Sequence, residues 1–154
     1  MMCLMALSMQ AQKTKVATGY TDLGLPSGTI WKNINATGFY TYDEAVRQFG
    51  SRLPSKAQWE ELKAECQWLW TGNGYKVIGP NGKYIVLPAL GYCGCDGMVI
   101  LVESYGHYLS STDNGYAWGT DWVWYLRFNS DSFRVGMYSG FRCGGYSVRL
   151  VQKK

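Results

Sequence analysis

The C-terminal stretch "YLRFNSDSFRVGMYSGFRCGGYSVRLV", residues 125–151, places the strongest constraint on the fold. Apolar side chains recur in it with a period of two, at Leu126, Phe128, Val135, Met137, Val148 and Leu150. This period places successive side chains on opposite faces of a strand, so one face packs on a core. The residues between the apolar ones share no chemical type, which indicates that the other face is not a repeating structural surface.

Two short helices are predicted before this stretch. In "TYDEAVRQFG", Thr41 and Glu44 form a capping box and Gly50 ends the helix, with Ala45, Val46 and Phe49 expected on one side. In "RLPSKAQWEEL", Ser55 is the N-cap and Gln58 takes the reciprocal position. The second helix is expected from Lys56 to about Glu65, with Trp59, Leu62 and Cys66 on one face.

Hairpins account for much of the remaining chain. "YTDLGLPSGTIWKNIN" predicts a Pro-Ser-Gly turn at 26–28 between strands at 20–23 and 29–33. In "YKVIGPNGKYIVLP", Asn81 and Gly82 supply the backbone conformation that a tight turn needs. From Gly91 onward no helical period is present. We therefore predict an α+β fold, with two short helices early and a β-rich C-terminal half of hairpins and long loops.

The charge distribution argues against nucleic acid as a partner. The formal net charge is +4, but four of the 15 basic residues lie at the chain ends: Lys13, Lys15, Lys153 and Lys154. The other 11 balance the 11 acidic residues, so the body has no basic stripe for a phosphate backbone. Aromatic residues are abundant, with 12 Tyr and 7 Trp, which favours a binding surface.

The beginning, "MMCLMALSMQAQK", resembles the end of a secretory signal peptide, so residues 1–12 are interpreted as a truncated one. Secretion or display at the cell envelope follows from this interpretation, and a frayed cytosolic N-terminus is the alternative. No stretch approaches the ~20 apolar residues of a membrane span.

Catalytic and metal-binding signals are weak. His107, the only histidine, has no motif that marks a nucleophile partner and is interpreted as a loop or surface residue. "CGC" at 93–95 lacks zinc-ligand spacing. Cys93 or Cys95 could pair with Cys66 or Cys143 in an oxidising compartment, and four unpaired thiols are the alternative. We expect no catalytic residue, metal or cofactor.

The order of several motifs resembles a known family. "YTDLGLPSGTIWKNIN", "RLPSKAQWEEL", "GHYLSST", "YLRFNS" and "GGYSVRLV" together resemble the Fibrobacter succinogenes major paralogous domain of Bacteroidetes, a C-type lectin-like domain. The resemblance implies one such domain over residues 20–152. The chain lacks the Glu-Pro-Asn and Trp-Asn-Asp triplets of calcium-dependent lectins, so calcium-dependent sugar binding is not implied.

The ending "SVRLV" also resembles variable proteins of diversity-generating retroelements, in which adenine-rich codons are rewritten. An AAC codon can then yield most residue types except Trp, Lys, Met, Gln and Glu. Eleven candidate positions all belong to the permitted set: Arg127, Asp131, Arg134, Gly136, Tyr138, Ser139, Gly140, Phe141, Cys143, Gly144 and Tyr146.

The function predicted from these resemblances is non-enzymatic binding of a protein or cell-surface ligand through residues 105–149. The candidate contact residues are Trp118 and Trp122 from a preceding loop, followed by Tyr125, Arg127, Asp131, Arg134, Gly136, Tyr138, Ser139, Phe141, Cys143 and Tyr146. One alternative is a structural or adhesive surface module without hypervariation. Another is an enzyme related to formylglycine-generating proteins, in which Cys93, Cys95 or Cys143 would react.

Overall fold

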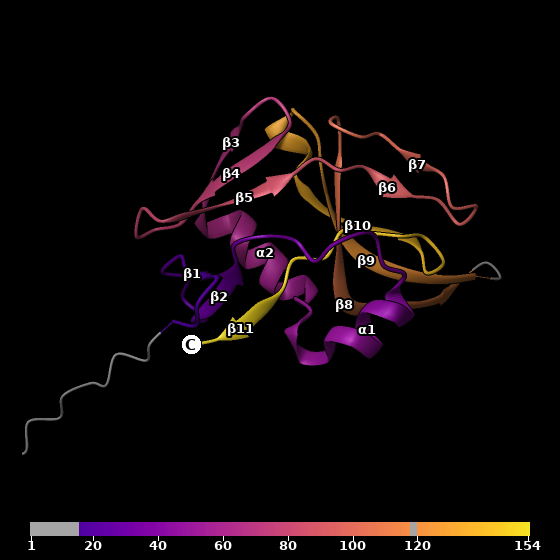
Figure 1. The fold of residues 1–154 in the computed structure, drawn as a ribbon, viewed down its shortest axis with the longest axis horizontal. Helices are drawn as coiled ribbons and strands as arrows, with labels where there is room; N and C mark the ends of the chain where they lie inside the picture. Colours follow the sequence, from indigo (N-terminus) through magenta and orange to yellow (C-terminus); the bar gives the residue numbers. More distant parts are fainter. Residues whose placement is uncertain (1–15, 118–119) are drawn as a thin grey trace, which may run out of the picture.

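Two capped helices lie among antiparallel sheets in the computed structural model, which describes residues 16–117 and 120–154 (Figure 1). Helix α1 spans Tyr42–Phe49 and helix α2 spans Lys56–Glu65, and each begins with the predicted capping box. In α1 the Thr41 side chain accepts a hydrogen bond from the Glu44 backbone N–H, and the Glu44 side chain accepts one from the Thr41 N–H. Ser55 and Gln58 form the same two hydrogen bonds at the start of α2. The α+β prediction is thus confirmed.

The strands form four antiparallel sheets. The first has the order β1-β2-β11, with strands Tyr20–Asp22, Thr29–Lys32 and Val151–Lys153. The second has the order β3-β4-β5, with strands Gln67–Trp70, Gly74–Ile78 and Tyr84–Pro88. The third has the order β10-β9-β8, with strands Gly136–Phe141, Thr120–Phe128 and Gly106–Ala117. The fourth joins β6, Tyr92–Cys93, to β7, Val99–Ile100.

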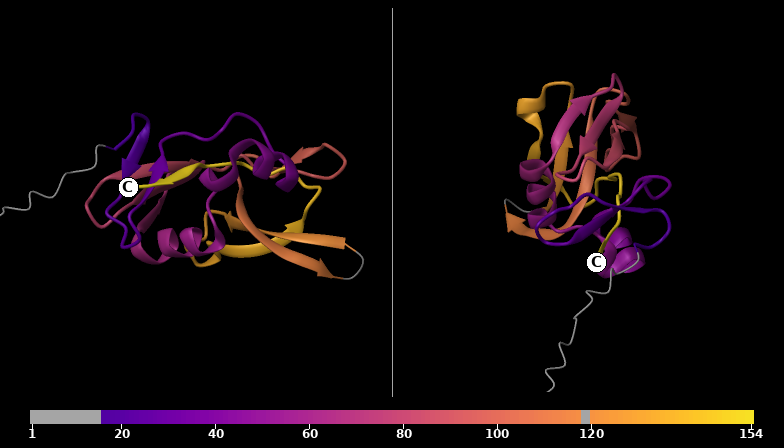
Figure 2. Two further views of the ribbon diagram at one scale, coloured as in Figure 1. Left: turned by 90° about the horizontal axis from the view of Figure 1, so that it is seen from below. Right: turned by 90° about the vertical axis from the view of Figure 1, so that its left-hand side faces the viewer.

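Both predicted hairpins are confirmed. β1 pairs with β2 across the Pro-Ser-Gly turn, and β4 pairs with β5 across the turn that contains Asn81 and Gly82. β11 then pairs with β2, with Val151 opposite Trp31, so the two ends of the described chain lie together. Figure 2 shows the long β8–β9 hairpin extending on the side away from these ends.

The two faces of the β8-β9-β10 sheet have different roles. One face packs on α2 through Tyr108, Leu126 and Phe128, with Trp59 of the helix donating from Nε1 to the Leu109 carbonyl at 3.2 Å. The opposite face contributes Leu109, Val123 and Tyr125 to a second cluster that includes Tyr146, Val148 and Leu150. The predicted apolar face of the C-terminal stretch therefore divides between two cores, and Met137 is only partly buried.

Two expectations need correction. Val46 is 39% exposed, because α1 packs through Tyr42, Ala45 and Phe49, a stripe at i, i+3 and i+7 from which Val46 is rotated. The C-terminal half also contains one 3-10 turn, η2 (Ser132–Arg134), which begins where the Asp131 side chain accepts a hydrogen bond from the Phe133 N–H.

Candidate ligand-binding site

A cavity of about 350 Å³ lies where the β9–β10 hairpin meets the segment that carries β6 and β7. Its lining is mostly aromatic and consists of Tyr92, Leu101, Tyr105, His107, Trp122, Tyr125, Arg127, Ser139, Gly140, Phe141 and Tyr146. Volumes of this order are typical of small-molecule sites. Six of the twelve candidate contact residues line it together: Trp122, Tyr125, Arg127, Ser139, Phe141 and Tyr146.

Strand pairing brings the polar residues of this cavity together. His107 of β8 lies opposite Arg127 of β9, and Leu109 lies opposite Tyr125 in the same ladder. Residues directly opposite in antiparallel strands have Cβ atoms about 4.5–5.5 Å apart, on the same face. The imidazole and the guanidinium are therefore neighbours on the face that borders the cavity.

His107 is buried, which contradicts its interpretation as a loop or surface histidine. His107 lies in β8 and is 4% exposed. It is buried because three tyrosine rings surround the imidazole, with distances between ring centroids of 4.7 Å to Tyr92, 5.3 Å to Tyr125 and 6.0 Å to Tyr105. Its Nδ1 atom has no hydrogen-bond partner. Burial, with a smaller effect of the Arg127 charge, lowers the pKa of His107 to about 4, so the ring is neutral at pH 7.

Arg127 is the one cationic side chain among the described residues that line the cavity. Its guanidinium lies over the Tyr138 ring, 3.8 Å from the centroid, in a cation–π contact. Within residues 16–117 and 120–154, no carboxylate lies within ion-pair distance of it. The N–H groups of a guanidinium lie in its own plane. Stacking on the face of a ring therefore does not use them, and they can still donate hydrogen bonds to a ligand.

Two buried tyrosines form the base of the cavity. Tyr125 and Tyr146 are 8% and 3% exposed, and their ring centroids are 5.0 Å apart. The Tyr146 hydroxyl donates to the Phe141 carbonyl at 2.8 Å, and burial raises the pKa of both phenols. The sequence predicted both tyrosines as exposed contact residues. They are instead buried, and a ligand can contact only the part of each side chain that lines the cavity.

Gly140 lies against this pair of rings, whereas Gly136 in the same strand has free space. A Cβ at 140 would lie 2.6 Å from the Tyr146 hydroxyl oxygen and 2.7 Å from Tyr125 Cε1. At Gly136 the nearest atom would be 3.7 Å away, the Nζ of Lys63. A side chain at 140 thus requires the tyrosines to move, which makes 140 a poor position for sequence variation.

The Gly140→Ala substitution is expected to lower the free energy of unfolding by about 1–3 kcal/mol, the usual effect of overpacking. Gly136→Ala is the matched control and is expected to change it little or to raise it by up to about 1 kcal/mol, because glycine is unfavourable inside a strand. Urea unfolding followed by tryptophan fluorescence measures both. Equal effects of the two substitutions would contradict the assigned position of Gly140.

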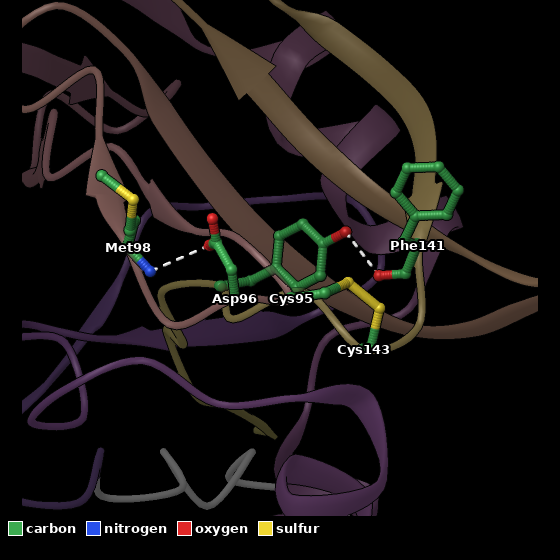
Figure 3. Close-up of a disulfide and its surroundings, with 6 residues drawn as sticks. Cys95, Asp96, Met98, Phe141 and Cys143 are labelled. Atoms are coloured by element: carbon green, nitrogen blue, oxygen red, sulfur yellow. Dashed lines mark hydrogen bonds between the residues drawn. A yellow bond between two sulfur atoms is a disulfide. The ribbon is translucent and has the colours of Figure 1, made fainter.

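A second cavity, of about 450 Å³, adjoins the first and shares Tyr92, Phe141 and Tyr146 with it. A disulfide beside it joins Cys95, in the turn between β6 and β7, to Cys143 after β10, with 5.2 Å between the Cα atoms (Figure 3). Of the pairings left open by the sequence, this one is formed, and Cys66 and Cys93 are free thiols. The disulfide fixes the β6–β7 turn against the end of β10.

The remaining candidate contact residues lie elsewhere or outside the described residues. Asp131 and Arg134 form an exposed ion pair at η2, which contacts β3. Gly136 borders a groove beside α2, and Cys143 is in the disulfide. Tyr138 of β10 does not line the cavity and packs under the Arg127 guanidinium. Among the residues that do line it, Trp122 belongs to β9, not to a preceding loop, and its ring stacks on Phe141. Trp118 lies outside the described residues.

Four residues of the cavity were not predicted from the sequence as contact or variable positions: Tyr92, Leu101, Tyr105 and His107. Tyr92, Leu101 and Tyr105 come from a segment without strong periodicity, so only the tertiary fold brings them to β9 and β10. Leu101 adopts a positive φ of 61°, as Glu103 does in the same turn, and this conformation is uncommon for residues other than glycine.

Of the three cysteines named in the enzyme alternative, Cys93 is a free thiol and the other two are not. Burial raises the pKa of the Cys66 thiol to about 11, so it is protonated at pH 7, and Cys95 and Cys143 are held in the disulfide. Across the described ranges, no three His, Cys, Asp or Glu side chains gather as metal ligands would. No helix in this part of the chain is long and apolar enough to cross a membrane.

Comparisons with protein-family models, curated proteins and solved structures found no match to this chain. The structure defines the protein as α+β, with an aromatic cavity and, adjoining it, a second cavity beside a disulfide.

Proposed function

We propose that this protein is a non-enzymatic ligand-binding domain of the C-type lectin-like class, which recognises its ligand at the cavity between the β6–β7 segment and β9–β10. One observation carries the proposal. Six of the twelve residues selected from the sequence as ligand contacts line the same cavity, although they come from three different segments of the C-terminal half.

Two further parts of the proposal concern where the protein acts and how its site varies. The Cys95–Cys143 disulfide supports secretion or display at the cell envelope, since disulfides persist in oxidising compartments. Arg127 and Phe141 are candidate variable positions that border the cavity. If they are diversified by a retroelement, the flanking DNA will contain a near-copy of the codons for residues 105–152, differing at adenines, beside a reverse-transcriptase gene. A neighbourhood with neither would remove diversification and leave the binding site.

Small aromatic fragments test the binding role without knowledge of the natural ligand. We expect neutral, anionic and cationic single-ring fragments to include binders with Kd near or below about 1 mM, which corresponds to about −4 kcal/mol. In two-dimensional amide NMR spectra their shift changes should gather at His107, Arg127 and Gly140. Shift changes that gather on β3 and β4, or no binder at all, would contradict the proposal.

A further inference from the structure

The charge inside the proposed site identifies a class of ligand. The first cavity contains one permanent cation, Arg127, and neither Asp nor Glu lines it. The second cavity contains Asp96, but the first does not. Because no carboxylate of the described residues neutralises Arg127, the cavity has a net charge of about +1 and favours a ligand with one negative charge.

The buried imidazole beside Arg127 adds no second charge. His107 is 96% buried and lines the cavity, and its Nδ1 atom is covered by protein atoms. Burial lowers the pKa of His107 to about 4, so the ring is neutral at pH 7. Arg127 is therefore the residue that selects the charge of the ligand.

The walls determine the rest of the ligand. Aromatic rings line the cavity around the two polar residues, at Tyr92, Tyr105, Trp122, Tyr125, Phe141 and Tyr146. Aromatic rings on several sides of the cavity favour a ligand with a flat apolar ring, which can stack on them or make edge-to-face contacts. A guanidinium pairs with a planar carboxylate through two parallel hydrogen bonds, whereas a phosphate dianion would leave a charge that one Arg does not balance.

We propose that the cavity binds an aromatic acid, a ligand with one carboxylate and one aromatic ring, with the carboxylate oxygens on Arg127 and the ring between the tyrosines. This assignment rests on the proposed function, since it names the ligand class of the same site. The carboxylate can belong to a free small acid or to the C-terminus of a peptide that ends in an aromatic residue, and both present the same chemistry.

The probes for this proposal are indole-3-acetate and indole-3-acetamide, which share shape and differ in charge. Isothermal titration calorimetry on the full chain at pH 7 should find the acetate bound about tenfold or more tightly than the amide. Arg127→Gln should remove that difference, since it deletes the cation and keeps a polar side chain. Arg134→Gln is the matched control, because Arg134 lies at η2 outside the cavity, and it should preserve the ratio.

The outcomes separate this proposal from the proposed function. If both indole compounds bind the cavity equally in the wild type, the carboxylate assignment is wrong and the binding site remains. If neither they nor any aromatic fragment binds, both proposals are wrong. A peptide Gly-Gly-Trp with a free C-terminus distinguishes the two sources: tighter binding than indole-3-acetate assigns the site to a chain terminus, and weaker binding assigns it to a free acid.

Discussion

Arg149→Met is expected to lower the free energy of unfolding by about 3–5 kcal/mol, because it removes the donor from several buried acceptors at once and each such loss costs roughly 1–3 kcal/mol. Arg149 is 1% exposed and has no carboxylate partner among the described residues. Its guanidinium donates instead to four oxygens at 2.6–3.1 Å, those of the Asn35 side chain and of the backbone at Lys32, Asn33 and Val86. Methionine fills a similar volume but removes the hydrogen bonds that Arg149 donates to all four acceptors.

The same network extends across the fold. The Asn35 side chain donates to the Tyr108 hydroxyl at 3.0 Å, which donates in turn to the Pro88 carbonyl at 2.7 Å. Burial lowers the pKa of Arg149 to about 10, so the side chain stays charged at pH 7. Arg149 thus joins the segment after β2, the end of β5 and strand β8.

Urea unfolding at pH 7 measures this effect. Arg47→Met on the exposed face of α1 is the matched control and should change the free energy of unfolding by no more than about 0.5 kcal/mol. A loss in Arg149→Met no larger than that of Arg47→Met would show that the buried network does not stabilise the fold.

Removal of the disulfide is expected to have the second large effect. Cys95 and Cys143 are separated by 48 positions in the sequence, and a loop of that length corresponds to about 4 kcal/mol in the chain-entropy description. For a chain of this size, such a loss lowers Tm by about 8–16 °C. The Cys95→Ser/Cys143→Ser double variant should show this decrease in thermal unfolding followed by circular dichroism.

The free thiols provide the control. Cys66→Ser/Cys93→Ser keeps the disulfide, so dithiothreitol should lower its Tm as it lowers that of the wild type. The same reductant should leave the Tm of Cys95→Ser/Cys143→Ser unchanged. A wild-type Tm that does not respond to reduction would contradict the stabilising role of the disulfide.

Local signals in the sequence predicted much of the scaffold. Ser55 and Gln58 identify the start of α2, because the capping box is completed within four residues. Asn81 and Gly82 identify the β4–β5 turn for the same reason. Strand periodicity also predicted that Leu126 and Phe128 of β9 pack on a core, and both are buried.

The site could be predicted only in part, because its depth depends on segments that are distant in sequence. Alternation places Tyr125 and Arg127 on one face of β9 but does not show what covers that face. The cover comes from Tyr92 and Tyr105, which enclose His107, and no local pattern links them to the strand. The pairing of Cys95 with Cys143 likewise requires the β6–β7 turn to be placed against β10.

The affinity of Tyr105→Ala for aromatic fragments tests most directly whether the aromatic cavity is the ligand site. Tyr105 is a partly exposed wall of the cavity, and Tyr84 is a 52% exposed tyrosine on β5 that serves as the matched control. A lost aromatic contact of about 0.5–1.5 kcal/mol corresponds to a roughly two- to tenfold weaker Kd. We predict this decrease in Tyr105→Ala and an unchanged Kd in Tyr84→Ala, measured by NMR titration of the fragments that bind the wild type. Equal affinities in both variants and the wild type would contradict the assignment of the cavity as the binding site.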